Sequence, residues 1–215
     1  ISAYAFYDCD LLESVVIPDS ITQIPERAFY GCSALASVSL PDSLTEIGIA
    51  AFSFCAALTD IRLPASITEI SAGLFSGCSS LATLEIPDSV TIIGGDAFVG
   101  CTSLTSMTIP DSVTEIGANP FPRSGLQSIT LSLDNPTFPV VDGALVRKAD
   151  NTLLSYFCGR QDAAYTIPQG ILAIGDNAFA YVDSLQSITI PDSVTSIGHS
   201  AFLFCRGLTD VTIPD

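Results

Sequence analysis

The 215-residue chain has few basic residues and almost no histidine. Seven Lys and Arg stand against 23 Asp and Glu, which gives a formal net charge of −16, and the single histidine is His199. Nucleic acid is therefore a poor partner, because phosphate binding needs clustered Lys and Arg, and the same charge disfavours anionic lipid. No nucleophile and base accompany His199 in any recognisable motif, so the sequence predicts that the chain is not an enzyme.

Long apolar runs and an export signal are missing as well. No stretch approaches the ~18 consecutive apolar residues of a membrane span, so no membrane insertion is expected. Residues 1–12 lack the basic start and the apolar centre of a signal peptide. The chain begins within a repeat and ends on Ile213-Pro214-Asp215, the start of another. We therefore expect a piece of a longer array, with any export signal or anchor outside it.

What the chain does contain is a repeat of 23 residues. Five cysteines keep that interval, and the segment IPDSVTIIGGDAFVGCTSLTSMT from Ile86 returns as IPDSVTSIGHSAFLFCRGLTDVT from Ile190. A fixed period of this length is typical of a solenoid, in which each repeat forms one coil stacked on its neighbours. We expect one elongated domain over residues 1–215.

The residues of one coil indicate its local structure. Leu81–Ile86 has the alternation of a half-buried strand, Pro87 ends it because proline cannot continue a sheet ladder, and Asp88-Ser89 is typical of a turn. A short extended stretch follows, such as residues 113–116. A compact helical turn then places Ala97-Phe98 in the core. The strands are predicted to stack in parallel on one face, with the helical turns and short strands opposite.

This pattern resembles the BspA-like, or Treponema-type, leucine-rich repeats, whose consensus is close to L-x-x-I-x-I-P-x-x-(V/I)-x-x-I-(G)-x-x-A-F-x-x-C-x-x. Residues 86–108 match it nearly letter for letter, and the resemblance covers essentially the whole chain. It implies a right-handed α/β solenoid with a parallel sheet on its concave face. It also implies an extracellular or cell-surface monomer that binds host, matrix or neighbouring-cell proteins as an adhesin. A structural spacer, holding another domain away from the cell surface, is the alternative.

The regular cysteines are predicted to be buried free thiols, and Cys158 lies outside their column. Equal phase points neighbouring cysteines in the same direction, which disfavours disulfides, and no closely spaced pair is present to bind zinc. A column of aspartates begins at Asp19, but one carboxylate per coil is too few for calcium, which takes six to eight oxygens. We therefore expect turn capping by these aspartates, and neither a metal nor a cofactor.

The rhythm breaks at residues 131–166, called here the island. Ala144–Arg147 and Thr152–Phe157 flank turn residues and predict a β-hairpin, after which Tyr165 is again in phase with the strand isoleucines. The family has similar insertions, matched here at Asn135-Pro136, Asp142-Gly143, Leu145, Leu153, Tyr156 and Gly159-Arg160. Arg and Tyr are enriched at interface hot spots. The island candidates for partner binding are Phe138, Arg147, Lys148, Tyr156, Phe157 and Arg160. In the competing interpretation the hairpin packs on the solenoid and its basic groups are solvated.

The outward positions of the strand face provide the second candidate surface. Its residues are Thr59, Asp60, Arg62, Thr83, Glu85, Thr105, Ser106 and Thr108. The face has no aromatic residue, so stacking of sugars is not expected. Neighbouring strands lie about 4.8 Å apart, so we expect Arg62 to pair with Glu85. Alternatively, the face is only a soluble surface whose threonines favour strand structure.

Overall fold

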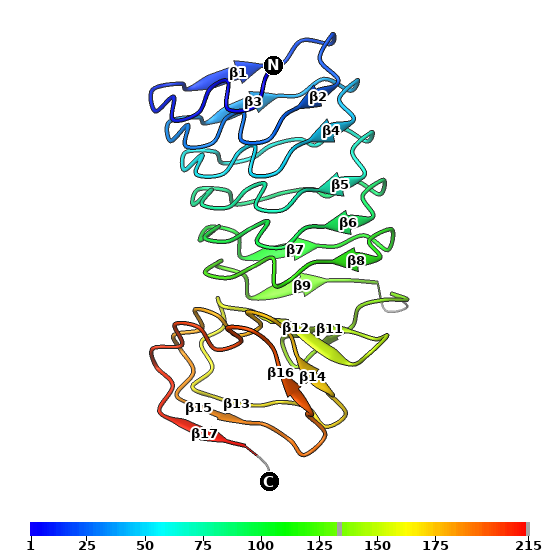
Figure 1. The fold of residues 1–215 in the computed structure, drawn as a ribbon, viewed down its shortest axis with the longest axis vertical. Coiled ribbons are helices and arrows are strands. Elements are labelled where there is room, and N and C mark those ends of the chain that lie inside the picture. The colour runs from blue at the N-terminus through cyan, green and yellow to red at the C-terminus, as the bar shows by residue number, and fades with distance from the viewer. Residues whose placement is uncertain (133–134, 214–215) are drawn as a thin grey trace.

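The computed structural model describes residues 1–132 and 135–213, which form a parallel β-solenoid. Successive coils follow one another down the long axis, with the N-terminus at one end and the C-terminus at the other (Figure 1). Strands of neighbouring coils pair in parallel, in most pairs with partners 23 residues apart, as Ser14 with Ser37 and Gln23 with Glu46. The 23-residue period of the sequence thus corresponds to one coil of the solenoid.

A first ladder contains the strands whose outward residues are mostly Ser and Thr. β1 pairs with β3, β7 with β9, and β13 with β15 and then β17. Tyr165 lies opposite Ile188, which confirms that it is in phase with the strand isoleucines. The strands are β1 Ser14–Val16, β3 Ser37–Ser39, β7 Ser106–Thr108, β9 Ser128–Thr130, β13 Ala164–Thr166, β15 Ser187–Thr189 and β17 Asp210–Thr212.

A second ladder contains two-residue strands, which follow the Pro-Asp-Ser turns. Its pairs are β2 with β4, β5 with β6, β6 with β8, and β14 with β16. The predicted short extended stretch before Gly117 is β8. The strands are β2 Gln23–Ile24, β4 Glu46–Ile47, β5 Glu69–Ile70, β6 Ile92–Ile93, β8 Glu115–Ile116, β14 Ala173–Ile174 and β16 Ser196–Ile197.

The island forms the predicted hairpin and joins the second ladder. β11 (Ala144–Arg147) and β12 (Thr152–Tyr156) are antiparallel, and β10 (Val140–Val141) adds a third strand to β11. On its other side β12 pairs in parallel with β14, with Leu153 opposite Ile174. The hairpin therefore supplies the second-ladder strand of its own coil.

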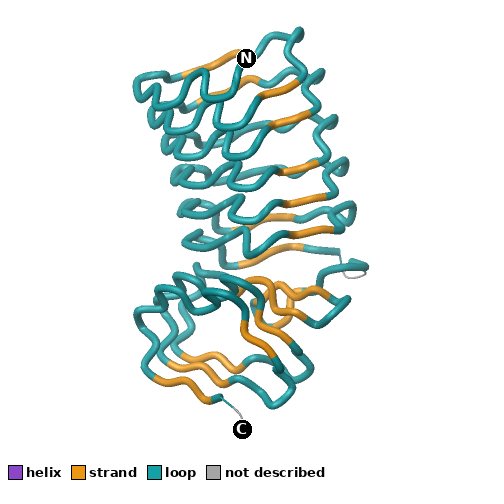
Figure 2. The backbone as a smooth tube through the Cα atoms, in the orientation of Figure 1, coloured by secondary structure: helices purple, strands orange, loops and turns teal. Residues whose placement is uncertain are grey.

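The turn segments between the second and first ladders are not helices, contrary to the prediction. Figure 2 shows loops there, and the described part of the chain contains no helical residue. Their N–H groups alternate in direction: Ala28 donates to Pro25 of its own coil at 3.3 Å, and Phe29 donates to Ala51 of the next coil at 2.9 Å. A helix directs every N–H back along its own segment. Stacking between coils takes half of those donors, so no helix forms.

A column of stacked aromatic rings runs through the core. Phe29 and Phe52 have ring centroids 5.5 Å apart with planes 7° apart. The column continues in the same way from Phe6 to Phe121. Each ring packs against rings of adjacent coils, so its burial depends on them, as expected for a repeat protein.

The hairpin divides the interior into two hydrophobic cores. Leu145, Leu154 and Phe157 pack into the first core, which extends to the N-terminal coils. Val146 and Tyr156 belong to the second core, which extends to the C-terminal coils. β12 is buried over its whole length. Because both faces of the strand meet apolar side chains, it carries a nearly continuous apolar sequence.

The regular cysteines are free thiols inside the solenoid, which confirms the prediction for four of them. Cys32, Cys55, Cys78 and Cys101 are fully buried, whereas Cys9 is exposed at the first coil. Each buried thiol donates to the carbonyl of the core phenylalanine one coil back; Cys78 to Phe52, for example, is 3.1 Å. The column is therefore a set of hydrogen bonds between coils.

Candidate protein-interaction surfaces

Backbone hydrogen bonds of the first ladder are missing in the coils where the strand-face candidates are charged. Ile17 donates to Ser39 at 2.9 Å, and Ile109 donates to Thr130 at 3.0 Å. Within the described chain, Leu40, Leu63 and Ile86 make no corresponding bond, and residues 59–63 and 82–86 form no strand. We call these two segments the ladder gap.

Two adjoining hollows lie along the ladder gap. One, of about 570 Å³, is lined by Asp60, Arg62, Thr83 and Glu85 among others. The second, of about 690 Å³, shares Thr83 and Glu85 with the first and reaches Ser106 and Thr108. All of these candidates are exposed. Thr59 and Thr105 are exposed as well but line neither hollow. The face thus offers a groove with polar, mainly acidic walls.

Arg62 does not pair with Glu85, so that expectation is wrong. Its guanidinium lies 3.8 Å from Asp42 Oδ1 in the preceding coil, and both side chains are more than four-fifths exposed. The open ladder removes the fixed strand spacing on which the expectation rested. Such an exposed pair contributes little to stability, and Glu85 has no basic partner among the described residues.

The aromatic island candidates are core residues, which corrects their prediction as contact residues. Phe138, Tyr156 and Phe157 are at most 1% exposed. Tyr156 stacks on Phe179 with centroids 5.3 Å apart, so it occupies the core-phenylalanine position of its coil. The missed signal is the 23-residue interval from Tyr156 to Phe179, which is the same interval that separates the regular phenylalanines.

The basic island candidates are engaged within the hairpin. The Arg147 guanidinium lies 2.7 Å from Asp150, and its hydrogen bond lowers the pKa of that carboxyl to about 2. Lys148 is exposed, and its Nζ donates to the carbonyl of Asn135 at 2.5 Å. These contacts hold the hairpin turns, and they leave Lys148 as the most accessible cation of the island.

Arg160 belongs to a polar cluster beneath the hairpin. Its Nε donates to Asp162 at 2.6 Å, and the Tyr156 hydroxyl donates to the same carboxylate. These two bonds, the one from Arg160 first, lower the pKa of Asp162. Burial raises the pKa of Tyr156. The three groups together attach the buried ring to the surface of the second core.

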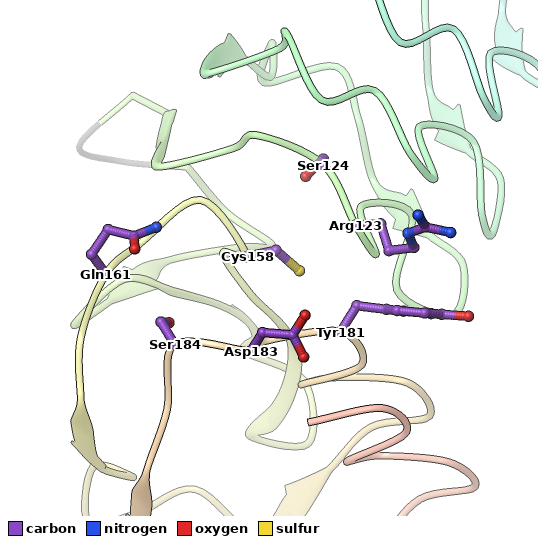
Figure 3. Close-up of a pocket in the computed structure, with 7 residues that line it drawn as sticks. All are labelled: Arg123, Ser124, Cys158, Gln161, Tyr181, Asp183 and Ser184. Atoms are coloured by element: carbon purple, nitrogen blue, oxygen red, sulfur yellow. The ribbon is translucent and has the colours of Figure 1, made fainter. Parts of the chain in front are cut away.

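A third hollow lies where the two cores meet. It encloses about 440 Å³ between Arg123, Ser124, Cys158, Gln161, Tyr181, Asp183 and Ser184 (Figure 3). The half-buried Cys158 thiol donates to the carbonyl of Ala180 at 3.4 Å. Burial raises the pKa of Cys158 to about 11, so the thiol stays protonated near neutral pH and is a poor nucleophile.

Neither a membrane span nor a metal cluster is found in the described residues. No helix there is long and apolar enough to cross a bilayer. Within residues 1–132 and 135–213, no three His, Cys, Asp or Glu side chains are grouped as metal ligands would be.

The fold and its exposed faces define a class: a repeat protein whose stacked coils form one core and an extended outer surface. The family model of the BspA type leucine rich repeat region matches residues 1–127 and 155–215 in six copies. The chain therefore belongs to this family, as the sequence pattern indicated.

Solved structures similar to the chain include three named bacterial proteins. A leucine rich cell surface protein of Faecalibacterium prausnitzii has a TM-score of 0.75 and 37% identity, covering 94% of this chain and 61% of that one. The pneumococcal vaccine antigen PcpA has a TM-score of 0.82 and 28% sequence identity, and the match covers 94% of this chain and 51% of PcpA. A leucine rich repeat protein of T. pallidum has a TM-score of 0.54 and 27% sequence identity, and the match covers 92% of this chain and 78% of that protein. The chain thus spans 61% and 51% of the first two proteins. Among curated proteins nothing matches.

Proposed function

We propose that this chain is the protein-binding part of a cell-surface or secreted protein, and that it contacts host or neighbouring-cell proteins as an adhesin through the ladder gap. Two relatives are described as a leucine rich cell surface protein and as a vaccine antigen, which supports a role at the cell surface. No catalytic role is part of the proposal.

The open first ladder is the observation that carries the proposal. Backbone N–H and C=O groups without a partner in the sheet are available to hydrogen-bond with groups of another chain that enter the hollows. At the gap, the backbone N–H groups of Leu63 and Ile86 have no backbone acceptor in the described chain, and the exposed side chains beside them are polar or charged. Asp60, Glu85 and Asp88 line the hollows, and Arg62 is the one basic lining residue. A partner segment with basic side chains fits this charge, and the net charge of −16 would speed its encounter.

The test is a binding screen of the chain against extracellular-matrix and serum proteins, repeated with Asp60→Asn plus Glu85→Gln. Glu46→Gln plus Glu115→Gln is the matched control, because it removes the same charge from exposed residues of the second ladder. We expect the gap variant to weaken binding about tenfold, a loss of about 1.4 kcal/mol. The control should retain binding.

Two results would overturn the proposal. If no partner binds, the chain serves as a spacer that holds another domain away from the cell. If both double variants weaken binding equally, overall charge rather than the ladder gap governs contact. Lys148→Ala tests the island in the same screen without disturbing its buried aromatics.

A further inference from the structure

One edge of the turn segments carries large side chains where the backbone favours glycine. The residue two positions after each regular core phenylalanine has a positive φ. Gly31, Gly77 and Gly100 meet this need in three coils. Phe54, Arg123, Tyr181 and Phe204 take the same place with φ of 61°, 56°, 63° and 55°. A side chain with a Cβ is strained in this region. Because glycine meets this backbone requirement without strain, the side chains found here are expected to contribute contacts beyond the local turn.

Two arginines elsewhere in the chain combine an aromatic ring with a carboxylate. Arg27 lies over Tyr4, 5.7 Å from the ring centroid, and its Nη1 is 2.7 Å from Glu26. The Arg160 guanidinium lies over Tyr156 at the same distance and binds Asp162. In both, the ring meets the cation and the carboxylate neutralises it.

Two arginines on the turn edge have the ring but not the carboxylate. Arg123 lies over Tyr181 at 5.3 Å, as Figure 3 shows, and Arg206 lies over Phe204 at 5.6 Å. Neither has an ion pair with any residue of the described ranges. A guanidinium over a ring keeps the N–H groups of its own plane available. Both arginines are therefore positioned to accept an external carboxylate.

These four side chains form one patch, which we call the Arg–aromatic edge: Arg123, Tyr181, Phe204 and Arg206. The rings of Tyr181 and Phe204 lie 5.0 Å apart in adjacent coils, and Phe204 is 48% exposed. Asp183 is the one acid that lines the neighbouring hollow, and its Oδ1 accepts the backbone N–H of Arg206 at 3.1 Å. Local charge at the edge is therefore positive, although the whole chain is acidic. More distant carboxylates are screened at physiological salt.

We propose that the Arg–aromatic edge binds an acidic segment of a partner protein. Carboxylates of the segment pair with Arg123 and Arg206, and an apolar side chain between them packs on Phe204. The arrangement repeats at an interface what Arg27 and Arg160 do within the chain. This surface differs from the ladder gap in both place and charge, so the inference adds to the proposed function and stands apart from it.

The test is a ¹⁵N NMR titration of the chain with the capped peptide Glu-Glu-Phe-Leu-Glu-Glu and with its Gln and Lys counterparts. We expect the Nε–H signals of Arg123 and Arg206 to shift with the Glu peptide and not with the Lys peptide. Arg123→Gln plus Arg206→Gln should weaken binding about tenfold, as expected on losing charge-assisted pairs. Arg27→Gln is the matched control and should leave affinity unchanged, since Glu26 already neutralises that arginine.

A second variant separates binding from folding. Tyr181→Gly removes the ring beneath Arg123 and relieves the positive φ, so we expect weaker peptide binding with no loss of thermal stability. The inference is overturned if the Glu peptide shifts neither arginine, if the Lys peptide binds the edge equally well, or if Arg27→Gln weakens binding as much as the double variant. It stands if the peptide binds as expected while the protein screen finds no partner.

Discussion

Raising the pH from 7 to 9.5 should destabilise the solenoid through its column of buried thiols. Cys55, Cys78 and Cys101 are fully buried. Burial raises the pKa of Cys55 and Cys101 to about 12 and that of Cys78 well above its usual range. In the folded chain these thiols therefore stay protonated over the whole interval, whereas in the unfolded chain they ionise near pH 8.5.

The sign and size of the effect follow from proton linkage. Above about pH 8.5 the unfolded state binds fewer protons than the folded state, so the free energy of unfolding falls as the pH rises. With an unfolded pKa of ~8.5, each thiol contributes a loss of about 1.4 kcal/mol between pH 7 and 9.5. The three thiols together give about 4 kcal/mol, a large part of the ~5–15 kcal/mol that typically stabilises a domain.

The assay is urea unfolding followed by circular dichroism at pH 7.0, 8.5 and 9.5 under a reductant. At the upper limit an unfolded tyrosine with a pKa of ~10 is only about a quarter ionised, so each tyrosine adds at most ~0.2 kcal/mol to the loss. The Cys55→Ala, Cys78→Ala and Cys101→Ala variants should each begin less stable and lose about 1.4 kcal/mol less between pH 7 and 9.5. This is at most about a quarter of the wild-type loss, because Cys158, whose pKa burial raises to about 11, contributes a similar amount. The reasoning is refuted if the triple variant keeps the full slope, or if the folded thiols titrate near pH 8.5 by ultraviolet absorbance.

Three further predictions, which use five substitutions, concern the packing around the island and the turn edge. Tyr156→Ala should cost about 3–5 kcal/mol of unfolding free energy, as for other buried rings, whereas Lys148→Ala should change it by less than ~0.5 kcal/mol. If thermal melts show a similar loss for the two variants, Tyr156 is not a core residue. Gly77→Ala should cost at least ~1–2 kcal/mol because of its positive φ, and more because a Cβ there would lie 2.6 Å from the Phe54 ring. Adding Phe54→Ala, which removes the ring but keeps a Cβ at that positive φ, should recover the second part alone. Asp162→Asn should weaken the chain modestly at neutral pH, since hydrogen bonds lower the pKa of Asp162. The difference should shrink as the pH falls below about 4, where the unfolded carboxyl becomes protonated, and disappear below the lowered folded pKa, where the carboxyl is protonated in both states. A difference that persists in acid would contradict the ion-pair origin.

The repeat allowed correct prediction wherever one coil resembles the next. The interval that aligned Cys55 with Cys78 also predicted parallel stacking, buried thiols and the in-phase Tyr165. The helical turns were predicted wrongly because in these segments every second N–H bonds to the next coil. Those bonds depend on stacking, so the residue pattern of a single coil does not reveal them. The island aromatics were predicted at the surface because Arg and Tyr are enriched at interface hot spots, a compositional argument that carries no information on whether their hairpin is buried. The hairpin instead separates the two hydrophobic cores. The segment Leu153–Phe157, apolar except for Ser155, is the sequence signal of a strand that is buried on both faces.

The ladder gap was not predictable from periodicity, because its coils keep the inward pattern of the paired ones. Ile61 and Leu84 are buried just as Met107 is. The difference lies outward, where the paired β7 carries Ser106 and Thr108 and the gap carries Arg62 and Glu85. Thr and Ser are small, and Thr favours strand structure, whereas charged side chains suit it less well. The residues best suited to contact a charged partner are thus those least suited to close the sheet.

Closing the gap by substitution tests that relation. Asp60→Ser, Arg62→Thr and Glu85→Thr together give the gap the outward residues of β7. We expect the Leu63 and Ile86 amides to exchange rapidly in the native chain, because no backbone acceptor among the described residues meets them, and to become as protected as that of Ile109 in the triple variant. Melting temperature should rise and binding through this face should fall, since a closed ladder offers no free backbone groups. If the two amides are already as protected as Ile109 in the native chain, the ladder is closed in solution and the gap cannot explain binding.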